Sequence, residues 1–294
     1  MGKLLDILAK KQVLVSDGAW GTFLYQRGLE AGDCPELWND THRSDVLAIA
    51  RSYVEAGADL ILTNSFGGSP IKLSHYGLAD RAEELNRKAA EISREAAGSD
   101  CLVAGSIGPT GEMLMMGNVS EQQVFDGFLL QAQALKAGGA DALVVETMSA
   151  IDEAALAVKA ALSTGLDVAC TFTFDRTVDN NFKTMMGVSV ESMVEAMASA
   201  GAHIIGSNCG NGFDQMIEIV TRIRATGTRL PVLIHANAGL PDIRDGQTIF
   251  PESPESMAGK VDALLAAGAD IIGGCCGTTP EHIRLIAQAV RQRA

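Results

Sequence analysis

Basic residues are scarce in this sequence. It contains 23 Lys and Arg against 36 Asp and Glu, which gives a formal net charge of −13 at pH 7. Proteins that bind nucleic acids neutralise phosphates with clustered Lys and Arg, and no such cluster occurs here. The charge balance therefore argues against a nucleic-acid-binding protein, and it disfavours binding to an anionic membrane surface for the same reason.

Long apolar runs and a secretion signal are also missing. No stretch reaches the roughly 18 consecutive apolar residues that a transmembrane helix needs. The opening segment, MGKLLDILAKK, predicts a short amphipathic helix, because its apolar stretch is too brief for a signal peptide and no small-residue cleavage pattern follows. The chain has only six cysteines in 294 residues. Six cysteines in a chain without a secretory signal indicate a reducing compartment, where clustered thiols serve metals or catalysis more often than disulfides. We therefore predict a cytoplasmic protein.

What the sequence does contain is a fourfold repeat. In each copy a helical pattern ends in a Gly-containing turn, a small residue and Asp or His follow, and a short apolar run then predicts a buried parallel strand. The copies lie at 55–64, 137–147, 199–209 and 266–276. Four weaker strand candidates alternate with them, at 13–17, 101–107, 168–174 and 231–237. Helical patterns fill the gaps at about 44–57, 77–97, 120–138, 150–164, 191–200, 213–226, 254–268 and 280–292.

Eight strands in strict alternation with helices predict an α/β fold of the (β/α)8 TIM barrel type, with residues 1–294 as a single domain. An open doubly wound sheet is the alternative, but no GxGxxG or GxxxxGK(S/T) nucleotide-binding sequence follows any strand. The active sites of TIM barrels lie where the strands end. The polar residues at these ends form the candidate site, and they are Asp17, Asn64, Ser106, Glu146, Asn208, Cys209, Asn237, Cys275 and Cys276.

Three cysteines among these residues predict a metal site. Cys209 ends the sixth predicted strand, and Cys275 and Cys276 end the eighth, so one strand separates them on the same face of the barrel. Zinc prefers such soft thiolate ligands in a tetrahedral arrangement, and a catalytic zinc keeps one position open for substrate. Adjacent cysteines of a regular strand point to opposite faces, so both can bind one ion only if the chain bends. Glycines on both sides of the pair, Gly274 and Gly277, permit that bend.

Other interpretations of these residues are open. A lone cysteine at a strand end is often only a small apolar filler, and a redox-active disulfide between Cys275 and Cys276 would leave Cys209 without a role. His235, near the end of the seventh strand, is interpreted as a structural histidine, and His203 lies at the opposite end of its strand. The remaining cysteines are assigned to loop or core, and they are Cys34, Cys101 and Cys170.

Seven segments, which span nearly the whole chain, together resemble the homocysteine S-methyltransferase family. This family includes the homocysteine-binding domain of cobalamin-dependent methionine synthase and betaine–homocysteine methyltransferase. The segments are DGAWGT at 17–22, EAGADLILTNSF at 55–66, GSIGPTGE at 105–112, VVET at 144–147, GSNCG at 206–210, NAG at 237–239 and GGCCGTTPEHI at 273–283. The last of them, paired with the upstream NCG, is highly specific.

The resemblance implies a zinc enzyme that binds homocysteine through its sulfur. The three cysteines match the zinc ligands of the family, and Asn237 matches a residue that can occupy the fourth zinc position before substrate arrives. Asp17 and Glu146 match the positions that hold the substrate ammonium. Gly18 is expected to offer a backbone N–H to the substrate carboxylate, and Asn64 is expected to line the pocket. Zinc would expel the proton of the substrate thiol and so deliver a nucleophilic thiolate.

The resemblance also implies a methyl donor. The matching segments are closer to the methionine synthase branch, so a methylated corrinoid protein is the expected partner. S-methylmethionine or another sulfonium, a betaine-type donor and a folate-derived donor are alternatives. A different thiol acceptor is another, because Trp20 stands where the family has smaller or other aromatic residues. Two further classes stay open: a metal-dependent lyase or aldolase on the same barrel, and a non-catalytic thiol-binding module that docks a corrinoid protein.

Overall fold

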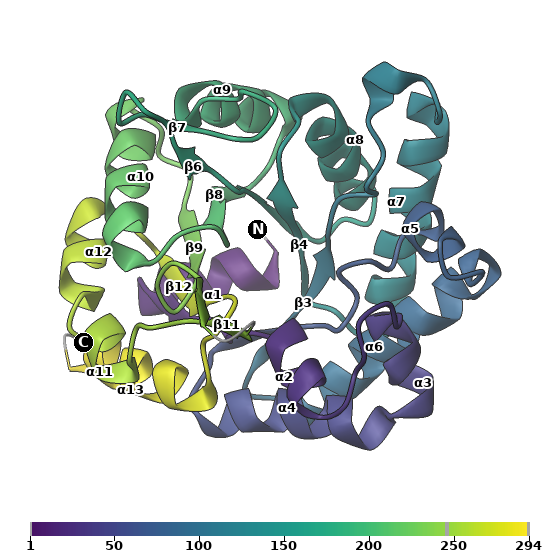
Figure 1. Cartoon of the computed structure of the whole chain (residues 1–294), viewed down its shortest axis with the longest axis horizontal. Coiled ribbons are helices and arrows are strands. Elements are labelled where there is room, and N and C mark those ends of the chain that lie inside the picture. Colours follow the sequence, from purple (N-terminus) through teal and green to yellow (C-terminus); the bar gives the residue numbers. More distant parts are fainter. Residues whose placement is uncertain (1, 245–246, 293–294) are drawn as a thin grey trace.

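Eight parallel strands form a barrel that is surrounded by helices (Figure 1). The structure is a computed structural model and describes residues 2–244 and 247–292. The barrel strands are β1 (Leu14–Val15), β2 (Leu60–Leu62), β3 (Leu102–Ile107), β4 (Ala142–Met148), β5 (Asp167–Phe172), β8 (Ile204–Asn208), β9 (Val232–Ala236) and β12 (Ile271–Gly274). Their hydrogen-bonded order is β1-β12-β9-β8-β5-β4-β3-β2, and a parallel bridge between Ser16 and Leu60 closes the ring. The predicted TIM barrel is confirmed.

The outer helices follow the predicted alternation, with two differences. They are α4 (Arg43–Glu55), α6 (Ala82–Ala97), α7 (Glu121–Ala137), α8 (Ile151–Leu162), α9 (Val190–Ala200), α10 (Phe213–Ala225), α11 (Pro254–Ala258), α12 (Val261–Ala267) and α13 (Pro280–Arg291). The single helix predicted over 254–268 is wrong, because the chain turns at Gly259 and the Lys260 N–H bonds to Met257, three residues back. The helix predicted over 77–97 begins only at Ala82.

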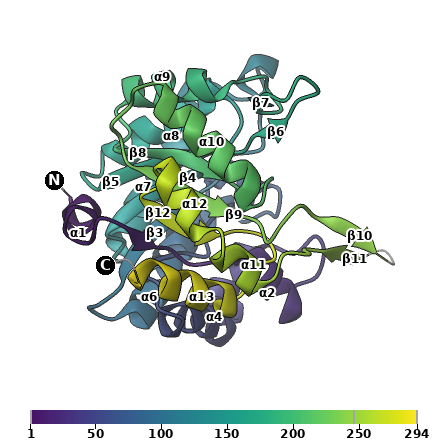
Figure 2. The same cartoon turned by 90° about the vertical axis from the view of Figure 1, so that its left-hand side faces the viewer.

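Several short elements lie in the loops that follow the strands. They are α2 (Gly21–Gln26), η1 (Pro35–Leu37), α3 (Trp38–Thr41), α5 (Pro70–Ser74), η2 (Ala79–Arg81), η3 (Leu114–Met116) and two hairpins, β6–β7 (Asp175–Arg176 with Phe182–Lys183) and β10–β11 (Asp242–Arg244 with Gln247–Ile249). Figure 2 shows α2 and both hairpins on the side of the barrel opposite the N-terminus. Elements of two to six residues are too short to show a hydrophobic period, which is why the sequence did not predict them.

The interior of the barrel is apolar except at one end. Alternate residues of the strands point inward and fill it, among them Leu60, Ala104, Val144, Ile204 and Ile271. The predicted N-terminal helix, α1 (Lys3–Lys11), closes the end where the strands begin, and it buries Leu4 and Leu8 against this core. The Gly2 and Leu5 N–H groups bind the Asp167 carboxylate at 3.1 and 3.0 Å. Among the described residues, a cavity opens at the opposite end, where the strands end.

The fourfold repeat has a structural role at the closed end. The residue before each repeat strand accepts a hydrogen bond from a backbone N–H of the preceding strand: Asp59 from Val15 (2.9 Å), Asp141 from Val103 (2.9 Å), His203 from Val168 (3.0 Å) and Asp270 from Val232 (2.7 Å). Each copy of the motif therefore joins two neighbouring strands by a hydrogen bond from a backbone N–H to a side chain. His203 is remote from the strand ends that carry the candidate site, as predicted.

No helix in the described part of the chain is both long enough and apolar enough to cross a membrane.

Candidate active site

The structure brings three cysteine sulfurs together at the open end of the barrel. Cys209 follows β8, Cys275 and Cys276 follow β12, and β9 lies between these strands. The three Sγ atoms lie within 4.8 Å of one another, and those of Cys209 and Cys276 are 4.0 Å apart. Sulfurs bonded at about 2.3 Å to one tetrahedral ion would be roughly 3.8 Å apart, so small side-chain shifts are enough to accommodate a zinc ion.

Both cysteine turns are fixed to the end of β9 by backbone hydrogen bonds. The Cys209 N–H donates to the His235 carbonyl at 2.9 Å, and the Cys275 N–H donates to the Ala236 carbonyl at 2.6 Å. Cys209 itself has a positive φ of 58°, which is unusual for a residue with a side chain. The chain therefore holds Cys209 in a left-handed conformation that turns it out of the strand.

Proximity makes the three thiols ionise unequally. The pKa of Cys209 is lowered because the Cys275 and Cys276 S–H groups donate hydrogen bonds to its thiolate. The pKa values of Cys275 and Cys276 are raised, first of all because each thiol gives its proton to a hydrogen bond with Cys209. A second and third negative charge at this spot need a cation between them. This donor set fits a metal ion.

Asn237 lies beside the cysteines. Its side chain helps to lower the pKa of Cys209 as a hydrogen-bond donor, and its backbone N–H donates to the Asn211 carbonyl at 2.9 Å. Its buried Oδ1 atom has no hydrogen-bond partner among the described residues. A buried polar oxygen without a partner is costly, so this atom is available to a ligand or an ion. The predicted role of Asn237 as a fourth ligand is consistent with this position and stays a prediction.

A cavity of about 270 Å³ opens in front of the three thiols. Gly18, Asn64 and Glu146, which the sequence predicted as substrate-binding residues, all line it. Gly18 is required there by close packing, because a Cβ atom at this position would come within 2.7 Å of Thr278 and 2.9 Å of Tyr53. The cavity thus places thiols and a carboxylate around one space.

Glu146 is the buried carboxylate of this cavity. It accepts a hydrogen bond from the Ser106 hydroxyl at 2.5 Å and one from the Asn208 amide at 3.3 Å. Burial raises its pKa to about 7, against the lowering effect of Ser106, and the nearby negative charges of Asp17 and Cys209 raise it further. A cation that entered the cavity would restore the charged carboxylate, which suits an ammonium group.

Asp17 lies behind the cavity wall and is not among the residues that line it. Its Oδ2 atom accepts hydrogen bonds from the Leu62 N–H at 2.7 Å and the Trp20 indole N–H at 2.9 Å. Burial raises its pKa to about 7, although these two hydrogen bonds oppose the shift. Trp20 does line the cavity, so its indole covers Asp17. The predicted contact of Asp17 with substrate therefore requires the indole N–H to be displaced or shared.

One wall of the cavity comes from a segment that the sequence analysis missed. Pro35 and Glu36 of η1 line the cavity, and the buried Glu36 carboxylate accepts the Gly67 N–H at 2.6 Å. The Asn64 amide donates to the Pro35 carbonyl at 2.8 Å and to Asn39 at 3.1 Å. Asn64 is thus a wall residue that also holds this segment. No periodic or motif signal in the sequence marks Glu36.

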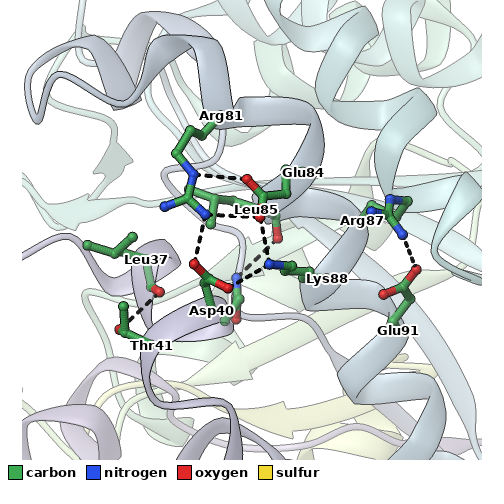
Figure 3. A network of polar contacts seen from close by, with 10 residues as sticks. Leu37, Asp40, Thr41, Arg81, Glu84, Leu85, Arg87, Lys88 and Glu91 are labelled. Carbon is green, nitrogen blue, oxygen red and sulfur yellow. Dashed lines mark hydrogen bonds and ion pairs between the residues drawn. The ribbon is translucent and has the colours of Figure 1, made fainter.

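An ion-pair network holds the same segment onto α6. Asp40 of α3 pairs with Arg81 at 2.8 Å and with Lys88 at 2.6 Å, and Glu84 pairs with both cations (Figure 3). Isolated surface ion pairs contribute little to stability, but a network of four charges restrains the geometry of the parts that it joins. We infer that it keeps the η1–α3 wall in place beside the cavity.

His235 is a buried residue that lines the cavity. Its Nε2 atom has no hydrogen-bond partner in the described part of the chain, and burial lowers its pKa to about 4. The imidazole is therefore neutral at physiological pH. It lines the cavity with Cys275 and Cys276, so the sequence interpretation of a structural histidine does not exclude contact with a bound molecule.

Comparisons with known proteins give a consistent result. A sequence profile of the family described as homocysteine S-methyltransferase matches residues 14–290. The methionine synthase of Mycobacterium leprae is 34% identical over 307 aligned residues, and that of Mycobacterium tuberculosis is 35% identical over 306. Each alignment covers 98% of this chain and 25% of the relative. The chain thus spans about a quarter of the length of these curated relatives.

Solved structures show the same architecture. The metallated form of the homocysteine methyltransferase MmuM from Escherichia coli matches with a TM-score of 0.79 and 24% sequence identity, over 99% of both chains. At this level of identity the likeness shows a shared fold. The carboxyl transferase domain of Rhizobium etli pyruvate carboxylase, at 17% identity and a TM-score of 0.55, shares only the barrel.

Proposed function

Since the chain belongs to the homocysteine S-methyltransferase family, we propose that it is a methyltransferase that transfers a methyl group to the thiol of homocysteine and so forms methionine. The observation that carries this proposal is the convergence of three thiols and a buried carboxylate on one cavity. The three thiols suit a substrate thiol bound through a metal, and the carboxylate suits an ammonium group. Membership of this family also argues against the lyase or aldolase alternative.

We propose zinc as the metal, held by Cys209, Cys275 and Cys276, with Asn237 as a fourth ligand before substrate arrives. When bound, zinc would lower the pKa of the substrate thiol and so supply a thiolate at neutral pH. Three cysteine thiolates around a divalent ion leave a net negative charge, which keeps electron density on the incoming sulfur. The free, closely spaced thiols of the described chain support this assignment and a reducing location such as the cytoplasm.

The remaining site residues would hold the amino-acid end of homocysteine. We propose that Glu146 and Asp17 hold its ammonium group and that the Gly18 N–H holds its carboxylate, with Asn64 in the wall. Glu146 faces the cavity directly, whereas Asp17 is reached past Trp20. Fixing the substrate at both ends would aim the sulfur at the open side of the barrel, where the donor must approach.

We propose a methylated corrinoid protein as the donor. The similarity to two methionine synthases supports this choice, and so does the surface around the cavity mouth. In the described residues, every exposed large apolar side chain lies on a segment that follows a barrel strand, including Met113, Met115, Met116, Val178 and Ile243. Methionine side chains adapt their shape, so a collar of this kind suits a partner that docks and leaves.

A donor screen tests the proposal. Zinc-loaded protein is mixed with homocysteine and, separately, a protein-bound methylcorrinoid, free methylcobalamin, S-methylmethionine, S-adenosylmethionine, betaine or a methylated folate, and methionine is measured by mass spectrometry. We expect the fastest turnover with the protein-bound methylcorrinoid, because it can contact the apolar collar. Faster turnover with a sulfonium would overturn the donor assignment. Homocysteine binding without turnover on any donor would instead indicate a thiol-binding module.

A further inference from the structure

We propose that Asn208 is a positioning residue that selects acceptors with an α-amino group, by aligning Glu146 while the adjacent Cys209 serves the thiol. This inference rests on the proposed function, because it takes Glu146 as the carboxylate that meets the substrate ammonium. Asn208 is the last residue of β8 and is completely buried. The sequence marked it only as a polar residue at a strand end.

The side-chain amide of Asn208 reaches from β8 across β5 to β4. Its Oδ1 atom accepts the Thr171 hydroxyl of β5 and the Thr147 backbone N–H of β4, both at 2.7 Å. Its Nδ2 atom donates to the Thr147 hydroxyl at 2.7 Å and to the Glu146 carboxylate at 3.3 Å. These contacts link β4, which carries Glu146, to β8, which Cys209 follows.

The donors around Asn208 determine which way the amide faces. A backbone N–H can only donate, so the atom that meets the Thr147 N–H must be the oxygen. The nitrogen is then directed to Glu146. An asparagine with both ends occupied cannot rotate without losing several hydrogen bonds in a buried site. Asn208 therefore presents a fixed N–H donor to one oxygen of Glu146, and Ser106 presents a second donor to the other.

The backbone around this contact is also unusual. Thr147 has a φ of 61° and Cys209 a φ of 58°, and they are two of the four non-glycine residues with positive φ in the described chain. One residue follows Glu146 and the other follows Asn208. Left-handed residues with side chains are costly, so surrounding hydrogen bonds must hold them. The Asn208 amide holds Thr147 through both its backbone and its hydroxyl, and thereby sets the direction of Glu146.

The consequence is selectivity for the amino group. Glu146 can meet a substrate ammonium only with the lone pairs that Ser106 and Asn208 leave free, so those two donors decide where the ammonium sits. Replacing Asn208 by Asp keeps the oxygen that Thr147 and Thr171 bind and exchanges the donor for a second oxygen beside Glu146. Glu146 would then turn away from that oxygen or take up a proton, and would lose its alignment with the ammonium.

The test compares two thiols in wild type, Asn208→Asp and Asn208→Ala. Homocysteine is compared with 4-mercaptobutanoate, which has the same thiol and carboxylate but no amino group. Dissociation constants are measured by calorimetry on zinc-loaded protein, together with zinc content and KM against kcat. For both variants we expect homocysteine to bind about tenfold or more weakly, a change of roughly 1.4 kcal/mol. Binding of 4-mercaptobutanoate, zinc content and kcat should stay close to wild type.

Matched variants separate this inference from the proposed function. Thr171→Val removes one hydrogen bond to Asn208 and leaves both hydrogen-bond donors to Glu146 in place. It should therefore change the dissociation constant of neither homocysteine nor 4-mercaptobutanoate. Glu146→Gln tests the underlying role: if it weakens both thiols equally, Glu146 does not bind the amino group and the proposed function fails at this residue. If Glu146→Gln affects only homocysteine while Asn208→Asp weakens both thiols equally, or neither, then Asn208 is merely structural and the inference is overturned.

Discussion

Replacing Cys209, Cys275 or Cys276 by Ser, one at a time, is expected to remove the metal and with it the activity. Wild-type protein purified under reducing conditions should contain about one zinc per chain, and each variant close to none, because two thiols and a hydroxyl bind zinc far more weakly than three thiolates. Methionine formation should fall by roughly a hundredfold or more, since the substrate thiol would stay mostly protonated. Metal analysis and initial rates measure the two effects.

The control for these variants is another cysteine of the same barrel. Cys101 lies just before β3, at the closed end, and within the described chain its sulfur donates to the Leu102 carbonyl at 3.5 Å, away from the three clustered thiols. Cys101→Ala should retain zinc and activity. The metal assignment would be wrong if wild type held no zinc under reducing conditions, or if a Ser variant kept both its zinc and its rate.

Glu146→Gln is expected to weaken homocysteine binding by about ten- to a hundredfold, because a hydrogen bond to a charged group contributes roughly 1.5–3 kcal/mol. The Gln amide is nearly the same size as the carboxylate, so zinc content should not change. Calorimetry with homocysteine measures the loss. Glu153 of α8 supplies a control. It is also a buried carboxylate, but it accepts hydrogen bonds from Thr110 and does not line the cavity. Glu153→Gln should leave homocysteine binding unchanged, and an equal loss in both variants would contradict the role of Glu146.

The same variant should stabilise the substrate-free protein at alkaline pH. The Glu146 pKa is raised from 4.5 to about 7, mainly by burial. The folded state therefore holds its proton more tightly than the unfolded state, so this group favours folding fully below pH 4.5, and the benefit is lost as pH rises through 7. A shift of this size corresponds to about 3 kcal/mol. Gln carries no such penalty.

Thermal unfolding at two pH values measures this effect. At pH 8 the Tm of Glu146→Gln should exceed that of wild type by several degrees, at equal zinc content, and at pH 5 the difference should largely disappear. A lower Tm at pH 8 would show that hydrogen bonds from Ser106 and Asn208 to the carboxylate outweigh its burial. A gain in stability from Glu146→Gln would agree with the general observation that residues kept for binding often lower the stability of a fold.

The sequence by itself determined the barrel and the position of the cysteines. Short apolar runs alternating with helical patterns allow few folds, and the strand ends of a parallel barrel all meet at one face. Cys209, Cys275 and Cys276 were expected at the same face once their strands were recognised, although their convergence also needed the chain to turn after β8 and β12. Helix signals were equally local: the helix predicted at about 280–292 is α13, which follows its N-cap residue Thr279 and begins at Pro280. The roles of the individual site residues stay predictions.

Only the tertiary structure decided what surrounds those residues. Three hydrogen bonds of the site depend on how a side chain meets a partner elsewhere in the fold. They join the Trp20 indole to Asp17, the Glu36 carboxylate to the Gly67 N–H, and the Asn208 amide to Glu146. Asn208 and Glu146 are 62 positions apart in the chain and lie on strands that are not neighbours. Periodicity and residue type report which face of an element is buried, but a hydrogen bond depends on distance and direction to within a fraction of an ångström. Such contacts exist only once the barrel has closed.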